Sequence, residues 1–179
     1  MNFQNSQTFQ NILRALDGEL KASTKYAIYG IKAKEDGFEQ IGDIFAETSC
    51  NEREHAEIMM KIIYGGEVPD TLTNLKESIS GERSEWSGLY RDFANTADME
   101  GYFDIANIFR GIANIEETHD FRFSRLAENI ETNNVFCKPE EILWVCLNCG
   151  HMQYGICAPE VCPVCGYPQG FFKEYCRDY

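Results

Sequence analysis

The chain has 179 residues and a formal charge of −13, from 16 basic and 29 acidic side chains. This length allows one domain, or one domain with a small module, and the acidic balance disfavours nucleic acid and anionic membranes as partners, because both bind basic surfaces. Residues 1–6 lack the basic and apolar regions of a signal peptide, and no stretch has the ~18 consecutive apolar residues of a membrane span. We therefore expect a cytoplasmic protein with reduced cysteines and no membrane partner.

Four amphipathic helices are predicted in chain order. In four stretches, apolar side chains recur close to every 3.6 residues. Glycine-containing loops separate the stretches, and glycine suits the left-handed turn that ends many helices. The predicted helices cover about 6–34, 38 to the Gly65–Gly66 pair, 72–99 and 102–131. Four helices of this length predict an all-α four-helix bundle.

Two of these helices carry the same Glu-x-x-His motif, at Glu52–His55 and at Glu116–His119. A spacing of three places the carboxylate and the imidazole side by side on one helix face. The other two helices supply further carboxylates, namely Glu19 on the first and Glu82 with Glu85 on the third. Two Glu-x-x-His helices and two Glu helices are the ligand set of a two-iron site inside a bundle.

The spacing of these residues also indicates a duplicated helix hairpin. Glu19 precedes Glu52 by 33 residues, and Glu82 precedes Glu116 by 34. The alternative is a set of solvated, salt-bridging glutamates, but it does not explain why two of the three histidines follow a glutamate at the same spacing and in phase. Carboxylate and imidazole ligands suit iron or manganese, and bound cations would offset the buried negative charge.

The character of the chain changes after Glu131. The polar run at 132–134 ends the last helix, and 138–141 is predicted to be a linker. Two Cys-x-x-Cys-Gly motifs follow, at Cys146–Gly150 and Cys162–Gly166. Each can form a tight knuckle whose backbone N–H groups point at the thiolates, and two facing knuckles build a tetrahedral four-sulfur site for iron or zinc.

Both parts of the chain together resemble the rubrerythrin family. The stretches that carry the resemblance are Ala15–Glu19, Asp43–Thr48 leading to Glu52–His55, Gly81–Trp86, Glu116–His119 and the second cysteine motif with its proline. The resemblance implies a ferritin-like diiron bundle at residues 1–134, a linker at 135–139 and a small, mostly β, rubredoxin-like iron domain at 140–179.

The same resemblance assigns the metal ligands. Glu52 and Glu116 correspond to carboxylates that bridge the two irons of an oxo-bridged centre. The other helical ligands would be Glu19, Glu82, Glu85, His55 and His119, and one more iron would be held by Cys146, Cys149, Cys162 and Cys165. In the family one iron exchanges a carboxylate for a histidine when it is reduced, which corresponds to Glu85 and His55. Tyr26 and Tyr90 match tyrosines that hydrogen-bond to ligand carboxylates, although filling the core is an equally good account of both rings.

The activity that the resemblance implies is reduction of hydrogen peroxide to water, in defence against oxidative stress. Electrons would come from a rubredoxin or an NAD(P)H-dependent reductase, since the chain has no Gly-x-Gly-x-x-Gly nucleotide motif. A head-to-tail homodimer is also implied. The alternatives are a ferroxidase or iron-storage protein, a dioxygen reductase, and a metal sensor or carrier with a zinc ribbon.

Four cysteines fall outside the two motifs. Cys50 is predicted to be a small apolar helix residue. Cys137, Cys157 and Cys176 are left as loop or tail thiols, with a regulatory disulfide as the alternative. Glu117, beside a proposed ligand, falls off the inward face by the helical period and is expected at the surface.

Overall fold

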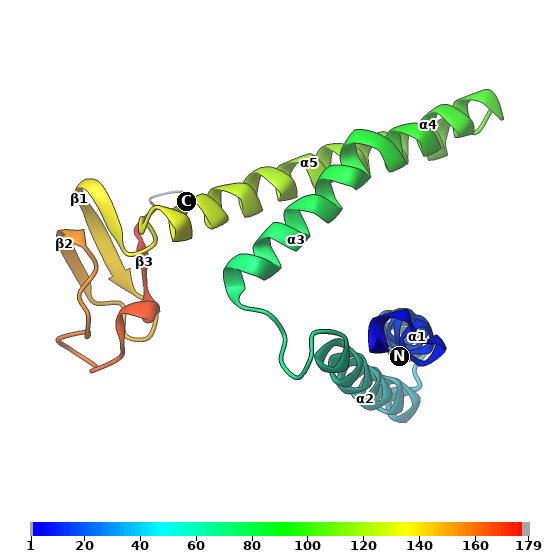
Figure 1. Cartoon of the computed structure of the whole chain (residues 1–179), viewed down its shortest axis with the longest axis horizontal. Helices are drawn as coiled ribbons and strands as arrows, with labels where there is room; N and C mark the ends of the chain where they lie inside the picture. Colours follow the sequence, from blue (N-terminus) through cyan, green and yellow to red (C-terminus); the bar gives the residue numbers. More distant parts are fainter. Residues whose placement is uncertain (1, 177–179) are drawn as a thin grey trace. The chain divides into compact units, whose positions relative to one another are not determined.

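A computed structural model describes residues 2–176 of the chain. The chain divides between Pro69 and Asp70 into two compact units, each of which is described by itself. Helices make up the first unit and begin the second, and a small sheet follows them (Figure 1). A short 3-10 turn at Phe3–Asn5 precedes the first long helix.

The first unit is a hairpin of helices α1 (Gln7–Glu35) and α2 (Glu39–Ile63). Helix α1 begins after Ser6, whose hydroxyl accepts a hydrogen bond from the Phe9 backbone N–H at 3.1 Å. Gly37, at φ 86°, turns the chain between the helices, a conformation that glycine adopts without a steric clash. So short a connection makes the two helices antiparallel neighbours.

Small residues hold these two helices close together. A Cβ atom on Gly42 would lie 3.0 Å from the carbonyl oxygen of Gly30, so a larger residue at position 42 would push the two backbones apart. The buried residues of the hairpin are Gly30, Ala33, Gly42 and Ala56. No larger apolar side chain of α1 or α2 is therefore fully buried within the hairpin.

The second unit begins with another hairpin. Helix α3 (Thr71–Ser84), a π-helical turn (Glu85–Leu89) and helix α4 (Tyr90–Met99) form one long run, and α5 (Phe103–Glu131) returns beside it (Figure 1). Within the π-helical turn the Tyr90 N–H donates to the carbonyl of Glu85, five residues back instead of four.

A three-stranded antiparallel sheet follows, in the order β2–β1–β3. Its strands are β1 (Cys137–Cys146), β2 (Met152–Cys157) and β3 (Phe172–Glu174), and a 3-10 turn at Gln169–Phe171 leads into β3. The core of this sheet module consists of Trp144, Cys146, Ala158, Cys162 and Phe172. Trp144 is 1% exposed, and its indole N–H donates to the Gly155 carbonyl at 3.0 Å, which satisfies its polar atom.

The start of β1 differs from the sequence prediction. Residues 138–141, expected to form a linker, belong to β1, and the strand register shifts between Cys137 and Ile142. Pro139 lies in this irregular stretch, where a residue without an N–H is tolerated. Cys137 and Cys157 are not the loop thiols that the sequence predicts, because they form a disulfide that joins β1 to β2.

The fold class is otherwise as predicted. The four expected helical segments are present, with a π-helical turn in the third, and a small sheet follows them. Among the described residues, no helix is both long enough and apolar enough to cross a membrane.

Candidate metal sites

The α1–α2 hairpin brings together the predicted ligands Glu19, Glu52 and His55. Oxygen and nitrogen atoms of these three residues lie within 4.8 Å of one another. The Nδ1 atom of His55 lies 3.0 Å from Oε2 of Glu52 and 3.6 Å from Oε2 of Glu19. We call this group the first half-site.

The second hairpin repeats the arrangement with Glu82, Glu116 and His119, whose donor atoms also lie within 4.8 Å of one another. Nδ1 of His119 lies 2.6 Å from Oε2 of Glu116 and 3.6 Å from Oε2 of Glu82. In each hairpin the histidine therefore contacts the glutamate of its own helix and reaches the glutamate of the other. We call this group the second half-site.

The carboxylates of each half-site perturb one another. A hydrogen bond between Glu19 and Glu52 raises the pKa of Glu19 and lowers that of Glu52. Burial raises the pKa of Glu82, and its hydrogen bond to Glu116 raises it further. Two hydrogen-bonded carboxyl groups share a proton unless a cation compensates their negative charge. Both half-sites therefore suit a hard metal ion.

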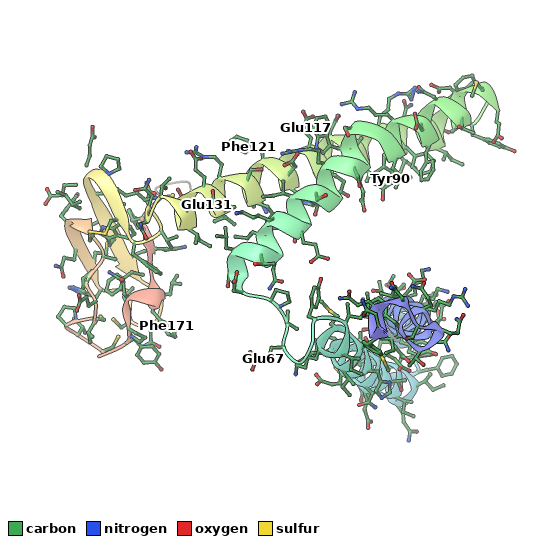
Figure 2. The ribbon with its side chains drawn as sticks, viewed as in Figure 1. Glu67, Tyr90, Glu117, Phe121, Glu131 and Phe171 are labelled. Carbon is green, nitrogen blue, oxygen red and sulfur yellow. A yellow bond between two sulfur atoms is a disulfide. The ribbon has the colours of Figure 1, made fainter. Side chains whose placement is uncertain are left out.

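Glu85, Tyr26 and Tyr90 are not among the three residues that form each half-site. Glu85 opens the π-helical turn and is not one of the three residues of the second half-site, although its charge raises the pKa of Glu82. Burial raises the pKa of Tyr90, and the charge of Glu85 adds to the effect. Glu116 and Glu82 of the second half-site raise the pKa of Tyr90 further, and Figure 2 shows Tyr90 on the other side of the hairpin from Glu117. Tyr26, in the first hairpin, packs its ring against Phe45.

The four predicted cysteines also come together in the sheet module. Cys146, Cys149, Cys162 and Cys165 have sulfur atoms within 4.8 Å of one another. The Sγ atoms of Cys146 and Cys165 are 3.8 Å apart, and those of Cys149 and Cys162 are 3.7 Å apart. In a tetrahedron with metal–sulfur bonds of ~2.3 Å, adjacent sulfurs are about 3.8 Å apart, so the sulfur positions fit one tetrahedral ion.

Each cysteine pair lies on a tight knuckle. The Gly150 N–H donates to the Cys146 carbonyl and the Gly166 N–H to the Cys162 carbonyl, both at 2.9 Å. Both glycines have positive φ, 76° and 74°. The turns that the Cys-x-x-Cys-Gly pattern predicted are thus present in duplicate.

Comparison with known proteins identifies the family. The sequence pattern of the Rubrerythrin family matches residues 10–71 and 73–147, and the pattern of the rubrerythrin rubredoxin-like domain matches residues 144–173. The chain belongs to the rubrerythrin family. A rubrerythrin of Nitratidesulfovibrio vulgaris is 42% identical over 183 residues, which cover 96% of each chain. A rubrerythrin of Clostridium perfringens is 40% identical over 193 residues, covering 99% of each. A solved structure of nigerythrin is 26% identical, covers 97% of this chain and 89% of its own, and has a TM-score of 0.35.

Membership of the rubrerythrin family makes the chain an oxidoreductase with a ferritin-like part and a rubredoxin-like part. Its cofactor is iron, which fits both the glutamate–histidine groups and the four-cysteine group. The predicted rubrerythrin fold and the predicted cofactor are therefore confirmed.

Two thiols of the four-cysteine site have pKa values that are shifted in opposite directions. A hydrogen bond from the Tyr167 backbone lowers the pKa of Cys165 to about 6, so this thiol ionises more readily than an ordinary cysteine. The His151 backbone acts to lower the pKa of Cys149, but burial and the neighbouring thiols outweigh it and raise the pKa to about 12. A metal ion must displace the remaining protons, because the thiolate is the ligand.

A buried carboxylate that was not predicted from the sequence lies beside the second half-site. Asp120 is 6% exposed and accepts hydrogen bonds from Arg83 Nε and Nη2, at 3.0 and 2.9 Å, and from the Trp86 indole N–H at 2.9 Å. Arg83 follows Glu82, and Asp120 follows His119, so this network fixes α3 against α5 next to the ligands. A signal was present: Asp120 falls in a seven-residue repeat of buried positions with Ala106, Ala113 and Ala127.

Proposed function

We propose that this protein is a non-haem diiron peroxidase that reduces hydrogen peroxide to water. Each turnover would convert one peroxide, two electrons and two protons into two water molecules. Electrons would pass from an external donor through the four-cysteine iron to the diiron centre. The cellular role would be defence against oxidative stress.

One observation carries the proposal: two matching half-sites and a tetrahedral four-cysteine group occur on a single chain. When bound, a diferrous pair would supply two electrons together, and the four-cysteine iron would supply electrons singly. A storage ferritin would have no use for the four-cysteine site, so the combination favours an enzyme that is reduced repeatedly.

The proposed ligand roles follow the resemblance to the family. Within their own hairpins, the four glutamates of the half-sites are 17% to 29% exposed. The His55 side chain is 52% exposed and that of His119 is 37% exposed. We assign exchange between carboxylate and imidazole ligation to Glu85 and His55, as the resemblance to the family implies, and Glu85 lies at the π-helical turn.

The tyrosines would orient carboxylates. Tyr90 has Glu85, Glu116 and Glu82 as electrostatic neighbours, so its hydroxyl can donate to a ligand oxygen. We propose the corresponding role for Tyr26 in the first hairpin. Such hydrogen bonds hold a ligand in one orientation and adjust its basicity.

The electron donor would be a rubredoxin or an NAD(P)H-dependent reductase. A head-to-tail homodimer would bring the sheet module of one chain to the diiron centre of another. Exposed apolar side chains on the sheet module, such as Val161 and Val164, suit a surface that meets a protein redox partner.

An anaerobic stopped-flow experiment tests the proposal. Fully reduced protein is mixed with hydrogen peroxide, and the absorbance of the four-cysteine iron is followed, with iron and zinc measured on the same sample. We expect rapid, stoichiometric oxidation of the four-cysteine iron by way of the helical site. Oxidation of the helical iron with a silent or zinc-filled cysteine site would overturn the relay and favour the ferroxidase alternative.

Two variants sharpen this test. In Cys149→Ser the cysteine site loses a ligand, so reduced protein should consume one equivalent of peroxide and then stop. The matched control is Cys50→Ser, which changes an exposed cysteine of α2 and should turn over like the parent. Repeating the mixing with dioxygen ranks the two oxidants, and a much faster reaction with dioxygen would favour the reductase alternative.

A further inference from the structure

The helix hairpins leave apolar faces uncovered within their own units. Ile41 in the first hairpin and Ile105 in the second each lie eleven residues, or three turns, before the glutamate of the Glu-x-x-His motif, so they share the face of the half-sites. They are 47% and 46% exposed. Among the described helical residues, only glycines, alanines and Asp120 are buried. A pair of helices cannot enclose a core, so each hairpin requires another hairpin on this face.

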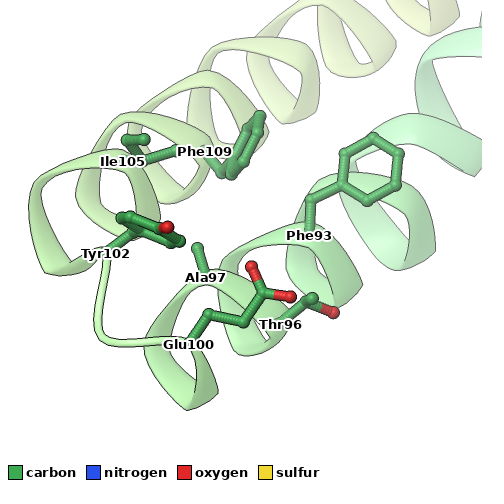
Figure 3. A pocket seen from close by; sticks show the side chains of 7 residues that line it. All are labelled: Phe93, Thr96, Ala97, Glu100, Tyr102, Ile105 and Phe109. Carbon is green, nitrogen blue, oxygen red and sulfur yellow. The ribbon is translucent and has the colours of Figure 1, made fainter.

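Figure 3 shows part of the open face of the second hairpin. A hollow of about 610 Å³ lies beside the α4–α5 turn, lined by Phe93, Thr96, Ala97, Glu100, Tyr102, Ile105 and Phe109. Phe109 precedes Glu116 by seven residues, or two turns, so the hollow continues the face of the second half-site. Apolar side chains from another helix surface can fill such an aromatic hollow.

The connection between the hairpins limits which copy can supply that surface. A ferritin-like bundle has one long crossover, because its second and third helices run in the same direction. Eleven residues separate Glu52 from the end of α2, and eleven separate the start of α3 from Glu82. If the two half-sites lie at the same height along the bundle axis, the end of α2 and the start of α3 are separated by both eleven-residue segments. At a rise of ~1.5 Å per residue, these two helix ends lie about 33 Å apart along the bundle.

The connector is too short for that distance. Eight residue steps lead from Ile63 to Thr71, which reach at most about 29 Å when fully extended. Much of the connector is also folded: the Gly66 N–H donates to the Lys61 carbonyl at 2.7 Å, which binds residues 64–66 to the end of α2. Asp70 caps α3 through the Thr73 N–H at 2.9 Å. The five steps from Gly66 to Thr71 span at most about 18 Å.

We propose that the ferritin-like bundle of this protein is closed by a second copy of the chain. The α1–α2 hairpin of one copy would pack on the α3–α5 hairpin of its partner, and the reverse, so that a dimer contains two bundles. Each diiron centre would then combine the first half-site of one chain with the second half-site of the other. Neither chain alone would hold a complete centre.

Two further observations agree with the exchange. The family match is itself divided at the start of α3, into residues 10–71 and 73–147. The alignment with the Nitratidesulfovibrio vulgaris relative spans 183 positions, more than the 179 residues of this chain, so the relative has residues that this chain lacks. The proposal rests on the diiron centre proposed above, and the experiment separates the two.

The test is complementation between two damaged chains. One variant, Glu52→Ala with His55→Ala, removes the first half-site; the other, Glu116→Ala with His119→Ala, removes the second. The full-length variants carry different tags, are expressed together, and the mixed assembly is isolated by both tags in turn. Iron(II) is added anaerobically, and iron per chain is measured after subtracting the four-cysteine iron from its absorbance.

Exchange predicts that the mixed dimer binds half of the helical iron of the wild-type dimer. One of its bundles combines two intact half-sites, and the other combines two damaged ones. Closure within each chain predicts no intact centre in the mixture. A mixed assembly without helical iron, or no mixed assembly at all, overturns the exchange when the wild type binds iron pairs. A wild type without helical iron instead overturns the proposed function.

Each variant is also measured alone by circular dichroism and sedimentation, so that loss of folding is detected. The milder pair Glu19→Gln and Glu82→Gln repeats the complementation with nearly unchanged side-chain volume. Weaker iron binding by each alone and recovery in the mixture support exchange, whereas equal binding in all samples contradicts it.

Lengthening the connector gives an independent readout. Insertion of twelve Gly and Ser residues between Glu67 and Val68, at the labelled position in Figure 2, lets the crossover span one chain. The high effective concentration of a tethered hairpin then favours closure within the chain. We expect the complementation to disappear in the lengthened variants and to persist when the same insert is placed between Asn133 and Asn134. Complementation that survives the longer connector overturns the reach argument.

Discussion

The two helix hairpins have the same plan and differ by one residue. Gly37 turns the first at φ 86° and Gly101 turns the second at φ 84°. Eighteen residues lead from Glu19 to its turn glycine, whereas nineteen lead from Glu82 to the other. The two glutamates of the first half-site are 33 residues apart and those of the second are 34 apart. The additional residue therefore lies before the turn glycine, in the first helical segment of the second hairpin.

The π-helical turn contains the additional residue. Tyr26 follows Glu19 by seven residues and packs on Phe45 with ring centres 6.0 Å apart. Tyr90 follows Glu82 by eight residues and packs on Phe109 at 6.1 Å. The rings are placed alike in spite of the unequal spacing, because the intervening turn at 85–89 is π-helical.

The two hairpins share one part of the site, and another part occurs in the second hairpin alone. Both supply two glutamates and a histidine. Only the second adds Glu85 and buries a carboxylate at Asp120, where the first hairpin has the buried residue Ala56 at the matching position. The additional charges and their partners therefore make the second hairpin the more specialised half.

Removing the additional residue should have the largest effect on activity. Deletion of Gly88 gives both hairpins the 33-residue spacing and converts the π-helical turn to ordinary helix. Glu85 then turns relative to Glu82 and Tyr90, and we expect peroxide turnover to fall by roughly tenfold to a hundredfold, as when an outer partner of a metal ligand is lost. Steady-state peroxide consumption at matched iron content checks this.

Gly81→Ala is the matched control for the deletion. Gly81 lies in α3 with no neighbouring atom within 4 Å of an added Cβ. Alanine should raise the free energy of unfolding by about 0.5–1 kcal/mol and leave turnover unchanged. Equal turnover in both variants would show that the π-helical turn has no part in the chemistry.

Asp120→Ala is expected to destabilise the second hairpin by about 2 kcal/mol. The change leaves the Trp86 indole N–H without its acceptor and removes two hydrogen bonds from Arg83, whose exposed side chain can turn to water. Urea unfolding of iron-free protein measures the change. Glu117→Ala, one turn from the network on the outer surface, should alter stability by less than about 0.5 kcal/mol. A similar loss in both variants would contradict this account of Asp120.

The contribution of Asp120 should also depend on pH. Hydrogen bonds from Arg83 lower the pKa of the Asp120 carboxyl group below its ordinary value. A carboxyl group whose folded-state pKa is lowered stabilises the protein above its unfolded pKa, and the stabilisation is lost as the pH falls through the folded value. The difference in unfolding free energy between the wild type and Asp120→Asn should therefore be constant from pH 7 to about 5 and shrink below pH 4.

The helices and the half-sites could be predicted because their signals are local. Apolar periodicity and turn glycines gave the helix limits to within one or two residues, and a three-residue spacing brings Glu116 and His119 together on any regular helix. The knuckles are equally local, since Gly150 and Gly166 each take the positive φ that the motif requires.

Features that depend on contacts between elements were not predicted. Asp120 carries a charge, and only its seven-residue phase with buried alanines indicates that α3 covers it. The Cys137–Cys157 disulfide depends on the pairing of β1 with β2, which nothing in the spacing of 20 residues specifies. The sequence predicts a linker at 138–141, where the structure has a strand, because Pro139 suppresses the strand signal.

The smallest expected effect concerns the first hairpin, which has no buried ion pair at the corresponding place. Its helices are joined instead by Ser23 and Ser49: each hydroxyl donates to the other's backbone carbonyl, at 2.9 and 2.8 Å. Ser49→Ala should lower the free energy of unfolding by about 1 kcal/mol, half of the effect of Asp120→Ala, because one neutral hydrogen bond is lost. Chemical denaturation of the iron-free protein measures both. Ser87→Ala, whose hydroxyl bonds only within its own helix, is the control. If Ser49→Ala were as damaging as Asp120→Ala, the two hairpins would depend equally on their polar contacts, and the specialisation of the second would lie in Glu85 alone.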